Sequence, residues 1–133
     1  MASSVKFLNG TSTTTNGYFA VTDADTSAYK MILADGTGLA IMVASGGIYM
    51  NVDIDGPRKG SGTIGKDWFG FIYNGSNGKL IPSNTSNITS SFSTGRGLTA
   101  WVIETGNMDY LKAVNGTCKK NNKKLDWTNT TCN

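Results

Sequence analysis

Apolar and polar residues alternate along several short runs of the chain, which is the pattern of β-strands with two different faces. The clearest alternation runs through residues 48–54, with the sequence IYMNVDI. A second run, residues 67–73, is rich in aromatic residues and predicts a further strand. On the first strand, one face would hold Ile48, Met50, Val52 and Ile54, and the other Tyr49, Asn51, Asp53 and Asp55.

Turn sequences connect these runs to others of the same kind. The pair Asp35-Gly36 lies between apolar runs at residues 28–33 and 38–44, as expected of a tight hairpin. A short apolar run at residues 79–81 follows the turn sequence NGSNG. Consecutive strands joined by short turns form an antiparallel sheet. The sequence therefore predicts a mainly β fold with a four- or five-stranded antiparallel sheet.

The segments at either side of this sheet have little periodicity. Residues 1–27 predict an extended N-terminal segment, so that a single globular domain would span residues 28–133. Residues 83–97 contain few apolar side chains and predict an exposed loop.

The region that follows carries short, mixed patterns. Residues 98–103, with the sequence LTAWVI, predict a short strand. Residues 105–113 predict one or two helical turns, because Met108 and Leu111 fall on one helical face and Thr105 could act as the N-cap.

Composition narrows the function classes. The chain has 133 residues, enough for one domain, and a formal net charge of +3, which does not indicate wholesale binding to nucleic acid. It contains no histidine, and histidine is the commonest general base and transition-metal ligand. With no nucleophile motif either, the sequence predicts a protein that is not an enzyme.

The longest apolar run and the N-terminus bear on whether the chain crosses a membrane and whether a segment precedes it. The longest apolar run, residues 38–44, is far too short to cross a bilayer, and the N-terminus does not resemble a signal peptide. The first four residues, MASS, resemble a start or tag remnant. We therefore expect that a native N-terminal segment precedes this sequence.

Two cysteines, Cys118 and Cys132, flank a polar and basic loop, KKNNKKLDWTNTT. Such a loop could not pack a core of its own, and a disulfide that closes it would stabilise the fold by about 3 kcal/mol. The alternative is two unrelated reduced thiols. We expect the disulfide, and with it an oxidising compartment outside the cytosol.

Three carboxylates, those of Asp53, Asp55 and Asp67, are candidates for a calcium site. Calcium binds six to eight oxygen ligands, and acidic residues at alternating positions beside a glycine can supply some of them. The spacing is not that of an EF-hand. The alternative is that Asp55 simply begins a turn, while Asp67 caps the loop or pairs with Lys66 or Arg58.

Four lysines inside the cysteine loop form a second candidate site together with a nearby tryptophan. Clustered lysines beside an aromatic side chain can contact a phosphate backbone and a stacked base. The alternative is a solvated loop that its charges keep soluble. The residues are Lys119, Lys120, Lys123, Lys124 and Trp127.

Three stretches, in this order, resemble the globular head of type IV pilin-like proteins, a family that includes type IV pilins and type II secretion pseudopilins. They are LADGTGLAIMV at residues 33–43, VDIDGPRKGSGTIGKDWFGF at residues 52–71 and TAWVIETGNMDYLK at residues 99–112. Cysteines often flank the third stretch in the family, where this chain has Leu98 and Ala113.

The resemblance implies an α+β fold in the full-length protein, in which a long apolar N-terminal helix lies partly across the sheet. It implies a structural subunit of an extracellular filament, active in assembly, adhesion or secretion, with other subunits and the inner-membrane assembly machinery as partners. It requires no cofactor. The pair Cys118 and Cys132 resembles the C-terminal disulfide loop of type IV pilins.

Two alternatives remain open at this point. One is a secreted, non-catalytic binding module that recognises a glycan or calcium through the aspartates. The other is a minor pilin that binds DNA through the lysines.

Overall fold

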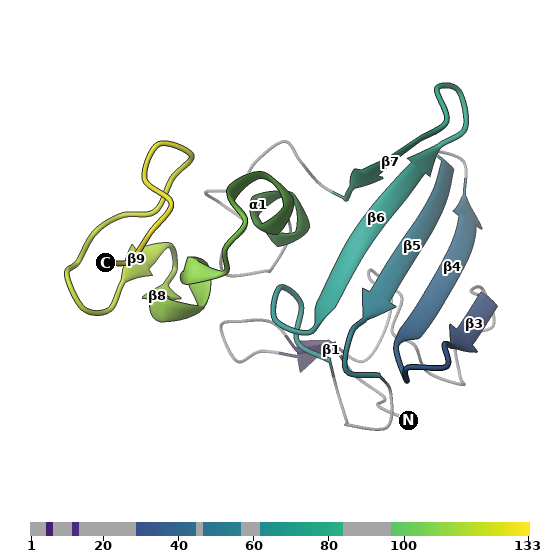
Figure 1. Cartoon of the computed structure of the whole chain (residues 1–133), viewed down its shortest axis with the longest axis horizontal. Helices are drawn as coiled ribbons and strands as arrows, with labels where there is room; N and C mark the ends of the chain where they lie inside the picture. The colour runs from purple at the N-terminus through teal and green to yellow at the C-terminus, as the bar shows by residue number, and fades with distance from the viewer. Residues whose placement is uncertain (1–4, 7–11, 14–28, 45–46, 57–61, 84–96) are drawn as a thin grey trace.

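The chain folds around a five-stranded antiparallel sheet with the strand order β3-β4-β5-β6-β7 (Figure 1). The structure, a computed structural model, describes residues 5–6, 12–13, 29–44, 47–56, 62–83 and 97–133. The prediction of a mainly β fold with four or five antiparallel strands is confirmed. The strands are β3 (Tyr29–Ile32), β4 (Gly38–Ala44), β5 (Gly47–Asp53), β6 (Trp68–Asn74) and β7 (Lys79–Pro82).

The hairpin between β3 and β4 forms at the predicted Asp35-Gly36 turn. Leu33 N–H donates to the carbonyl of Thr37 at 2.8 Å, and Gly36 has a φ of 94°, which glycine adopts without strain. The Asp35 carboxylate accepts the N–H of Thr37 at 2.9 Å. These contacts fix the register of the first two strands.

The predicted N-terminal extended segment contains a small ladder of its own. Strand β1 (Val5–Lys6) pairs with β2 (Ser12–Thr13) in an antiparallel arrangement. The rest of this segment, like residues 84–96 of the predicted exposed loop, lies outside the described residues.

Residues 98–105 form a helix, α1 (Leu98–Thr105), so the prediction of a strand at residues 98–103 is wrong. The helix buries Leu98 and Trp101, three positions apart on one face. It ends at Gly106, whose φ of 68° and N–H donated to the carbonyl of Val102 make a left-handed C-cap. Burial on a helical face outweighed the strand preference of the β-branched and aromatic residues.

Helix α1 lies at the edge of the sheet, beyond the end of β7 (Figure 1). The carbonyl of Gly70 in β6 accepts the N–H of Ser83 at 2.8 Å, and the Gly70 N–H donates to the hydroxyl of Thr99 at 3.1 Å. The threonine side chain therefore satisfies a backbone group that the short strand β7 leaves unpaired.

A 3-10 helix, η2 (Asp109–Lys112), follows α1 and confirms a helical turn in this region. Thr105 is not its N-cap, which was predicted wrongly. Thr105 ends α1, and its hydroxyl donates to the carbonyl of Trp101 at 2.7 Å. Two short paired strands come next, β8 (Ala113–Val114) and β9 (Thr117–Cys118).

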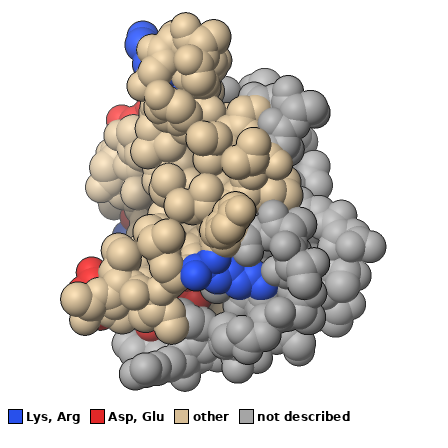
Figure 2. All heavy atoms as spheres, turned by 90° about the vertical axis from the view of Figure 1, so that its right-hand side faces the viewer, with Lys and Arg blue, Asp and Glu red and all other residues tan. Residues whose placement is uncertain are grey.

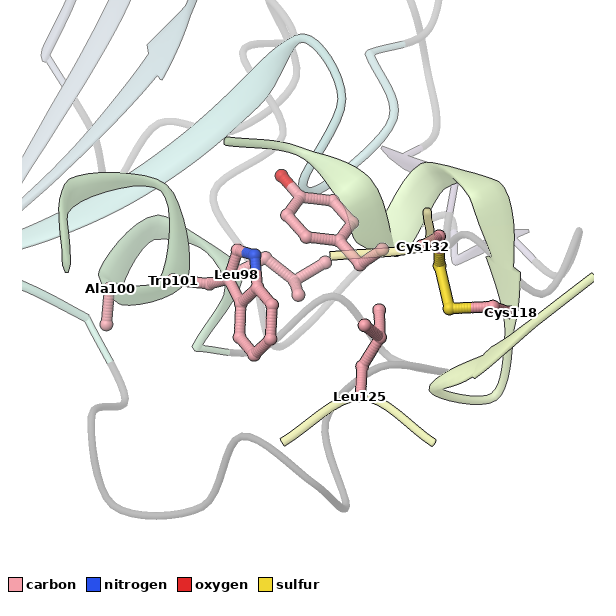
Figure 3. Packing of buried hydrophobic residues seen from close by; sticks show 7 residues of the cluster. Leu98, Ala100, Trp101, Cys118, Leu125 and Cys132 are labelled. Atoms are coloured by element: carbon pink, nitrogen blue, oxygen red, sulfur yellow. A yellow bond between two sulfur atoms is a disulfide. The ribbon is translucent and has the colours of Figure 1, made fainter. Parts of the chain in front are cut away.

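The buried hydrophobic cluster of the C-terminal region surrounds Trp101 (Figure 3). The rings of Trp101 and Tyr110 meet edge to face with centroids 6.4 Å apart. Leu125, from the basic loop, is fully buried here. The loop has no core of its own, as predicted, but it completes one with α1 and η2. The members are Leu98, Ala100, Trp101, Tyr110, Cys118, Leu125 and Cys132.

The two faces of the sheet differ in character. Strand register places a mixture of small, polar and apolar side chains on one face, where Ala40, Asn51 and Trp68 are buried. The other face, called here the apolar face, is entirely aliphatic and aromatic across β3 to β6. Its members are Tyr29, Met31, Leu39, Ile41, Val43, Ile48, Met50, Val52, Phe69, Phe71 and Tyr73.

Part of the apolar face is open to solvent. Two members of this face are largely exposed, Tyr29 at 76% and Val43 at 70%. Seen from the β3 side of the molecule, most of the described atoms belong to uncharged residues (Figure 2). An exposed apolar surface of this kind is characteristic of an interface rather than of a solvated face.

Candidate functional sites

The three candidate aspartates lie where β5 ends and β6 begins. Strand β5 stops at Asp53, so Asp55 belongs to the bend that follows rather than to the same strand face, contrary to the predicted alternation. Ile54 N–H donates to the carbonyl of Asp67 at 2.8 Å. This bond brings the residue before β6 next to the end of β5.

Two of these carboxylates accept backbone hydrogen bonds. Asp53 is 4% exposed, and its carboxylate accepts the N–H of Gly56 at 3.0 Å. The Asp67 carboxylate accepts the N–H of Thr63 and so closes the turn before β6. The alternative interpretation, in which Asp67 caps this loop, is therefore realised in the structure.

The aspartates also influence one another. Burial raises the pKa of Asp53 to about 6, with further contributions from a hydrogen bond to Asp55 and from the charges of Asp55 and Asp67. Burial likewise raises the pKa of Asp67, with the Asp55 charge adding to it, while the Thr63 N–H and the Lys66 charge oppose the rise. The site thus holds carboxylates whose ionisation is unfavourable.

The aspartates do not converge as metal ligands would. Among the described residues, no group of three or more Asp, Glu, Cys or His side chains is arranged to hold a metal ion. Asp55 is exposed and Asp53 is buried, although their carboxyl groups are hydrogen-bonded to each other. Arg58, which the sequence offered as a partner, lies outside the described residues.

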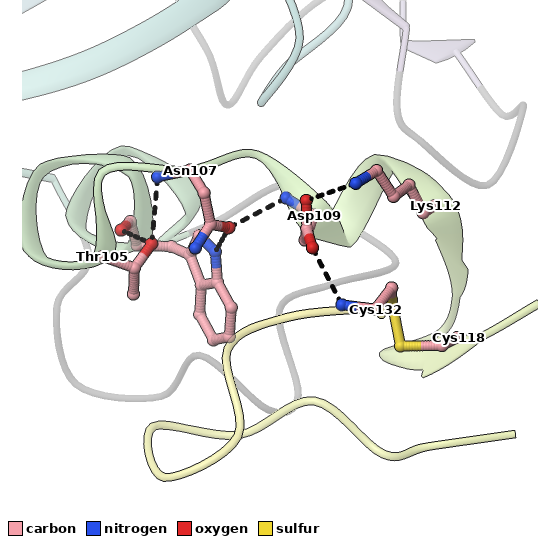
Figure 4. Close-up of polar contacts among 7 residues, drawn as sticks. Thr105, Asn107, Asp109, Lys112, Cys118 and Cys132 are labelled. Carbon is pink, nitrogen blue, oxygen red and sulfur yellow. Dashed lines mark hydrogen bonds and ion pairs between the residues drawn. A yellow bond between two sulfur atoms is a disulfide. The ribbon is translucent and has the colours of Figure 1, made fainter. Parts of the chain in front are cut away.

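The disulfide between Cys118 and Cys132 is present, which confirms the prediction, with the two Cα atoms 5.4 Å apart. Both cysteines are buried against the core around Trp101. Asp109 adds a second fastening, because its carboxylate accepts the N–H of Cys132 at 2.8 Å and pairs with Lys112 at 2.9 Å (Figure 4). These contacts hold the C-terminal end of the loop against η2.

The four lysines lie on a tight turn at the start of the disulfide loop, called here the lysine turn (Lys119, Lys120, Lys123 and Lys124). All four are exposed. Cys118 N–H donates to the carbonyl of Lys123 at 2.8 Å, and Asn122 N–H donates to the carbonyl of Cys118 at 3.1 Å. The backbone of the turn is thus fixed while its ammonium groups face solvent.

Trp127, predicted to act with these lysines, lies later in the same loop. Its ring stacks on that of Trp101, with centroids 5.7 Å apart and an interplanar angle of 27°. Trp127 is nevertheless 43% exposed. The structure therefore places the indole on the core while leaving much of it open to solvent.

Sequence reasoning missed three polar contacts that hold the sites in place. The Tyr110 hydroxyl donates to the carbonyl of Gly65, which ties η2 to the turn before β6. The Asn107 side chain accepts both the indole N–H of Trp101 at 3.3 Å and the N–H of Asp109 at 2.9 Å. The sequence TGNMD carried the signal for the contact between Asn107 and the Asp109 N–H, because asparagine after a helix-ending glycine favours such a turn.

Comparison with known proteins identifies no relative: no family model, curated protein or solved structure matches the chain. Within the described residues, the structure contains no helix long and apolar enough to cross a membrane.

Proposed function

We propose that this chain is the globular head of a structural subunit of an extracellular type IV pilus-like filament. The apolar face of the sheet supports the proposal most strongly. A sheet of five strands with such a face is stable in water when another element covers that face. The resemblance supplies the covering element, the long N-terminal helix of the family.

The exposure of individual side chains agrees with a long, narrow cover. Tyr29 and Val43 are the most exposed of the face, while residues near its middle, such as Met50 and Phe71, are half-buried. Aliphatic and aromatic side chains at these positions would contribute roughly 25 cal/mol for each Å² that a helix removes from water. Covering the apolar face with a helix would therefore lower the free energy of the assembled state.

The decisive experiment uses the complete protein in its source cells. Antibodies raised against this domain should label surface filaments along their length. The variant Val43→Glu in the full protein should lose filament incorporation, because it places a charge on the apolar face. Ile103→Glu, a matched change at a 59% exposed position on α1, is the control and should incorporate.

Other labelling patterns would contradict the proposal. Label found in the medium as free protein, with no filament stained, would support a secreted binding module instead. Normal incorporation of Val43→Glu would show that the apolar face plays no part in assembly.

We also propose that the aspartates take up calcium, supported by the unfavourable ionisation of Asp53. A divalent cation beside carboxylates that repel one another relieves both the repulsion and the burial of charge. Because no group of three or more acidic side chains in the described part of the chain is arranged to hold a metal ion, backbone oxygens and water would complete such a site.

A further inference from the structure

The lysine turn carries positive charge that the chain does not neutralise. Across residues 118–133, four lysine side chains stand against one carboxylate, that of Asp126. The Asp126 carboxylate is already occupied, since it accepts the N–H of Thr128 at 2.8 Å and the Thr128 hydroxyl at 2.6 Å. No carboxylate in the described part of the chain forms an ion pair with any of these lysines.

The turn is organised before any ligand arrives. The disulfide and the backbone bonds around Cys118 close it, and Lys119 N–H donates to the carbonyl of Lys112 at 3.1 Å. Asn122 holds a φ of 56°, which asparagine tolerates better than most residues. A rigid loop loses little conformational entropy when it binds, so its charges can contribute fully to affinity.

The indole of Trp127 lies close to this charge along the chain and is equally well supported. Buried Trp101 packs on it from the protein side and is itself held by Asn107. Two residues after Trp127 in the sequence, the Asn129 side chain donates to the carbonyl of Lys124 at 2.7 Å. This bond ties the segment that follows the indole to the end of the lysine turn.

Several polar side chains of the loop form hydrogen bonds within the loop itself. The Asn121 side chain accepts the N–H of Lys123 at 3.0 Å, and Asn129 and Asp126 are engaged as described. Neutral sugars pair their hydroxyls with side-chain amides and carboxylates, and Asn121, Asp126 and Asn129 already use such groups within the loop. What the surface still offers is ammonium charge and an aromatic surface.

That pair of features matches one class of ligand. Proteins that bind single strands without sequence preference combine a basic surface along the phosphate backbone with aromatic side chains on which bases stack. We propose that the lysine turn and Trp127 bind single-stranded nucleic acid, with phosphates on the lysines and a base stacked on the indole. This interaction goes beyond assembly and does not depend on it.

The first test measures charge. A fluorescent oligothymidylate of about 20 nucleotides is titrated with the protein from about 25 to 200 mM salt and followed by anisotropy. Each neutralised phosphate of a single strand contributes about 0.7 to the slope of log affinity against log salt. The double variant Lys123→Gln/Lys124→Gln should bind more weakly, with the slope reduced by about 1.4.

The matched control removes two exposed lysines elsewhere, Lys66→Gln/Lys79→Gln, and should leave the affinity and the slope unchanged. Equal weakening by both double variants would overturn the proposal, because it would show only a response to net charge. The absence of binding at the lowest salt would overturn it as well.

The second test measures stacking. Trp127→Leu should weaken oligothymidylate binding by about 5- to 140-fold, whereas Trp127→Tyr, which keeps an aromatic ring, should retain most of it. Thermal melts of both variants separate lost binding from lost folding, and Trp127→Tyr with the lysine variants keeps the proposal testable if Trp127→Leu unfolds.

Two other ligands, a DNA duplex and heparin, are tested in the same assay. A duplex of the same length that binds as tightly as the single strand would overturn the proposal. Heparin binding as tight as that of oligothymidylate, together with no effect of Trp127→Leu on either, would indicate an acidic polysaccharide and would also overturn it. Filament labelling does not enter these assays, so the failure of either proposal is recognised separately.

Discussion

Replacing Asp53 with asparagine should stabilise the protein at neutral pH. Asp53 is buried at the end of β5, and burial together with Asp55 raises its pKa from 3.8 to about 6. The folded state therefore binds this proton more tightly than the unfolded state does. The sign follows from linkage: the stability is full below about pH 4 and falls as the pH rises through about 6.

The magnitude follows from the shift. One pKa unit corresponds to about 1.4 kcal/mol, so a rise from 3.8 to about 6 gives an upper limit of about 3 kcal/mol. Asp55 is exposed, so solvent screens part of its repulsion with Asp53 and leaves about 1–3 kcal/mol. Asparagine has nearly the same shape and can still accept the N–H of Gly56, but it does not ionise.

The assay is urea denaturation of the wild type and of Asp53→Asn at pH values between about 4 and 7.5, with chelator present. The free energy of unfolding should be higher for Asp53→Asn than for the wild type by about 1–3 kcal/mol at pH 7.5 and nearly the same at pH 4. Asp55→Asn, at an exposed position, should give a smaller gain in the same direction because it removes one neighbouring charge.

Asp35→Asn is the control of opposite sign. Hydrogen bonds from Thr37 lower the pKa of Asp35, so its ionised form is favoured in the folded state and the change should bring no gain at neutral pH. If Asp53→Asn instead destabilised the protein equally at every pH, the ionised carboxylate would be a required acceptor and the reasoning would be wrong.

Three further measurements test other parts of the structure. Reduction of the Cys118–Cys132 disulfide should lower the free energy of unfolding by about 3 kcal/mol in urea titrations with and without reductant, and an unchanged midpoint would contradict a stabilising bond. Tyr110→Phe should cost about 1–2 kcal/mol in the same assay, because the carbonyl of Gly65 loses its donor in a buried position. Calcium should raise the melting temperature above that in chelator, and Asp55→Asn should reduce this difference; equal melts would remove the calcium proposal.

The sheet could be predicted because its signals are local. Strand β4 begins and ends where the sequence predicted, at residues 38 and 44, since apolar alternation and the Asp35-Gly36 turn act within a few residues. The ends of the strands β3, β5 and β6 each differ from the predicted ends by one residue.

Helix α1 could not be recognised from its own first six residues. LTAWVI is rich in residues that favour strands, and the burial that makes it helical comes from groups distant in sequence, such as Leu125. A usable sequence signal was the pair of glycines that flank the helix, Gly97 and Gly106. Both adopt a positive φ in the structure, and a glycine at such a position is typical of a helix end.

The candidate sites also differ in how far the local sequence could predict them. The disulfide and the exposed lysines were predictable from composition and spacing. The contact between Tyr110 and Gly65 joins residues 45 positions apart and has no local pattern. For the aspartates, the sequence offered a shared site as one of two interpretations, but it could not predict that Asp53 would be buried, which decides the sign of its effect on stability.

The positions of the two proposed surfaces bear on how they would operate together. The apolar face belongs to the sheet, and the lysine turn belongs to the C-terminal region, which lies at the opposite end of the molecule from β3 (Figure 1). In the proposed filament, a helix that covers the apolar face would draw the sheet towards the filament centre. Because the disulfide loop packs on α1 and η2 rather than on that face, such assembly leaves its lysines and Trp127 accessible. One face of the fold can thus serve assembly while the distant loop contacts a partner in solution.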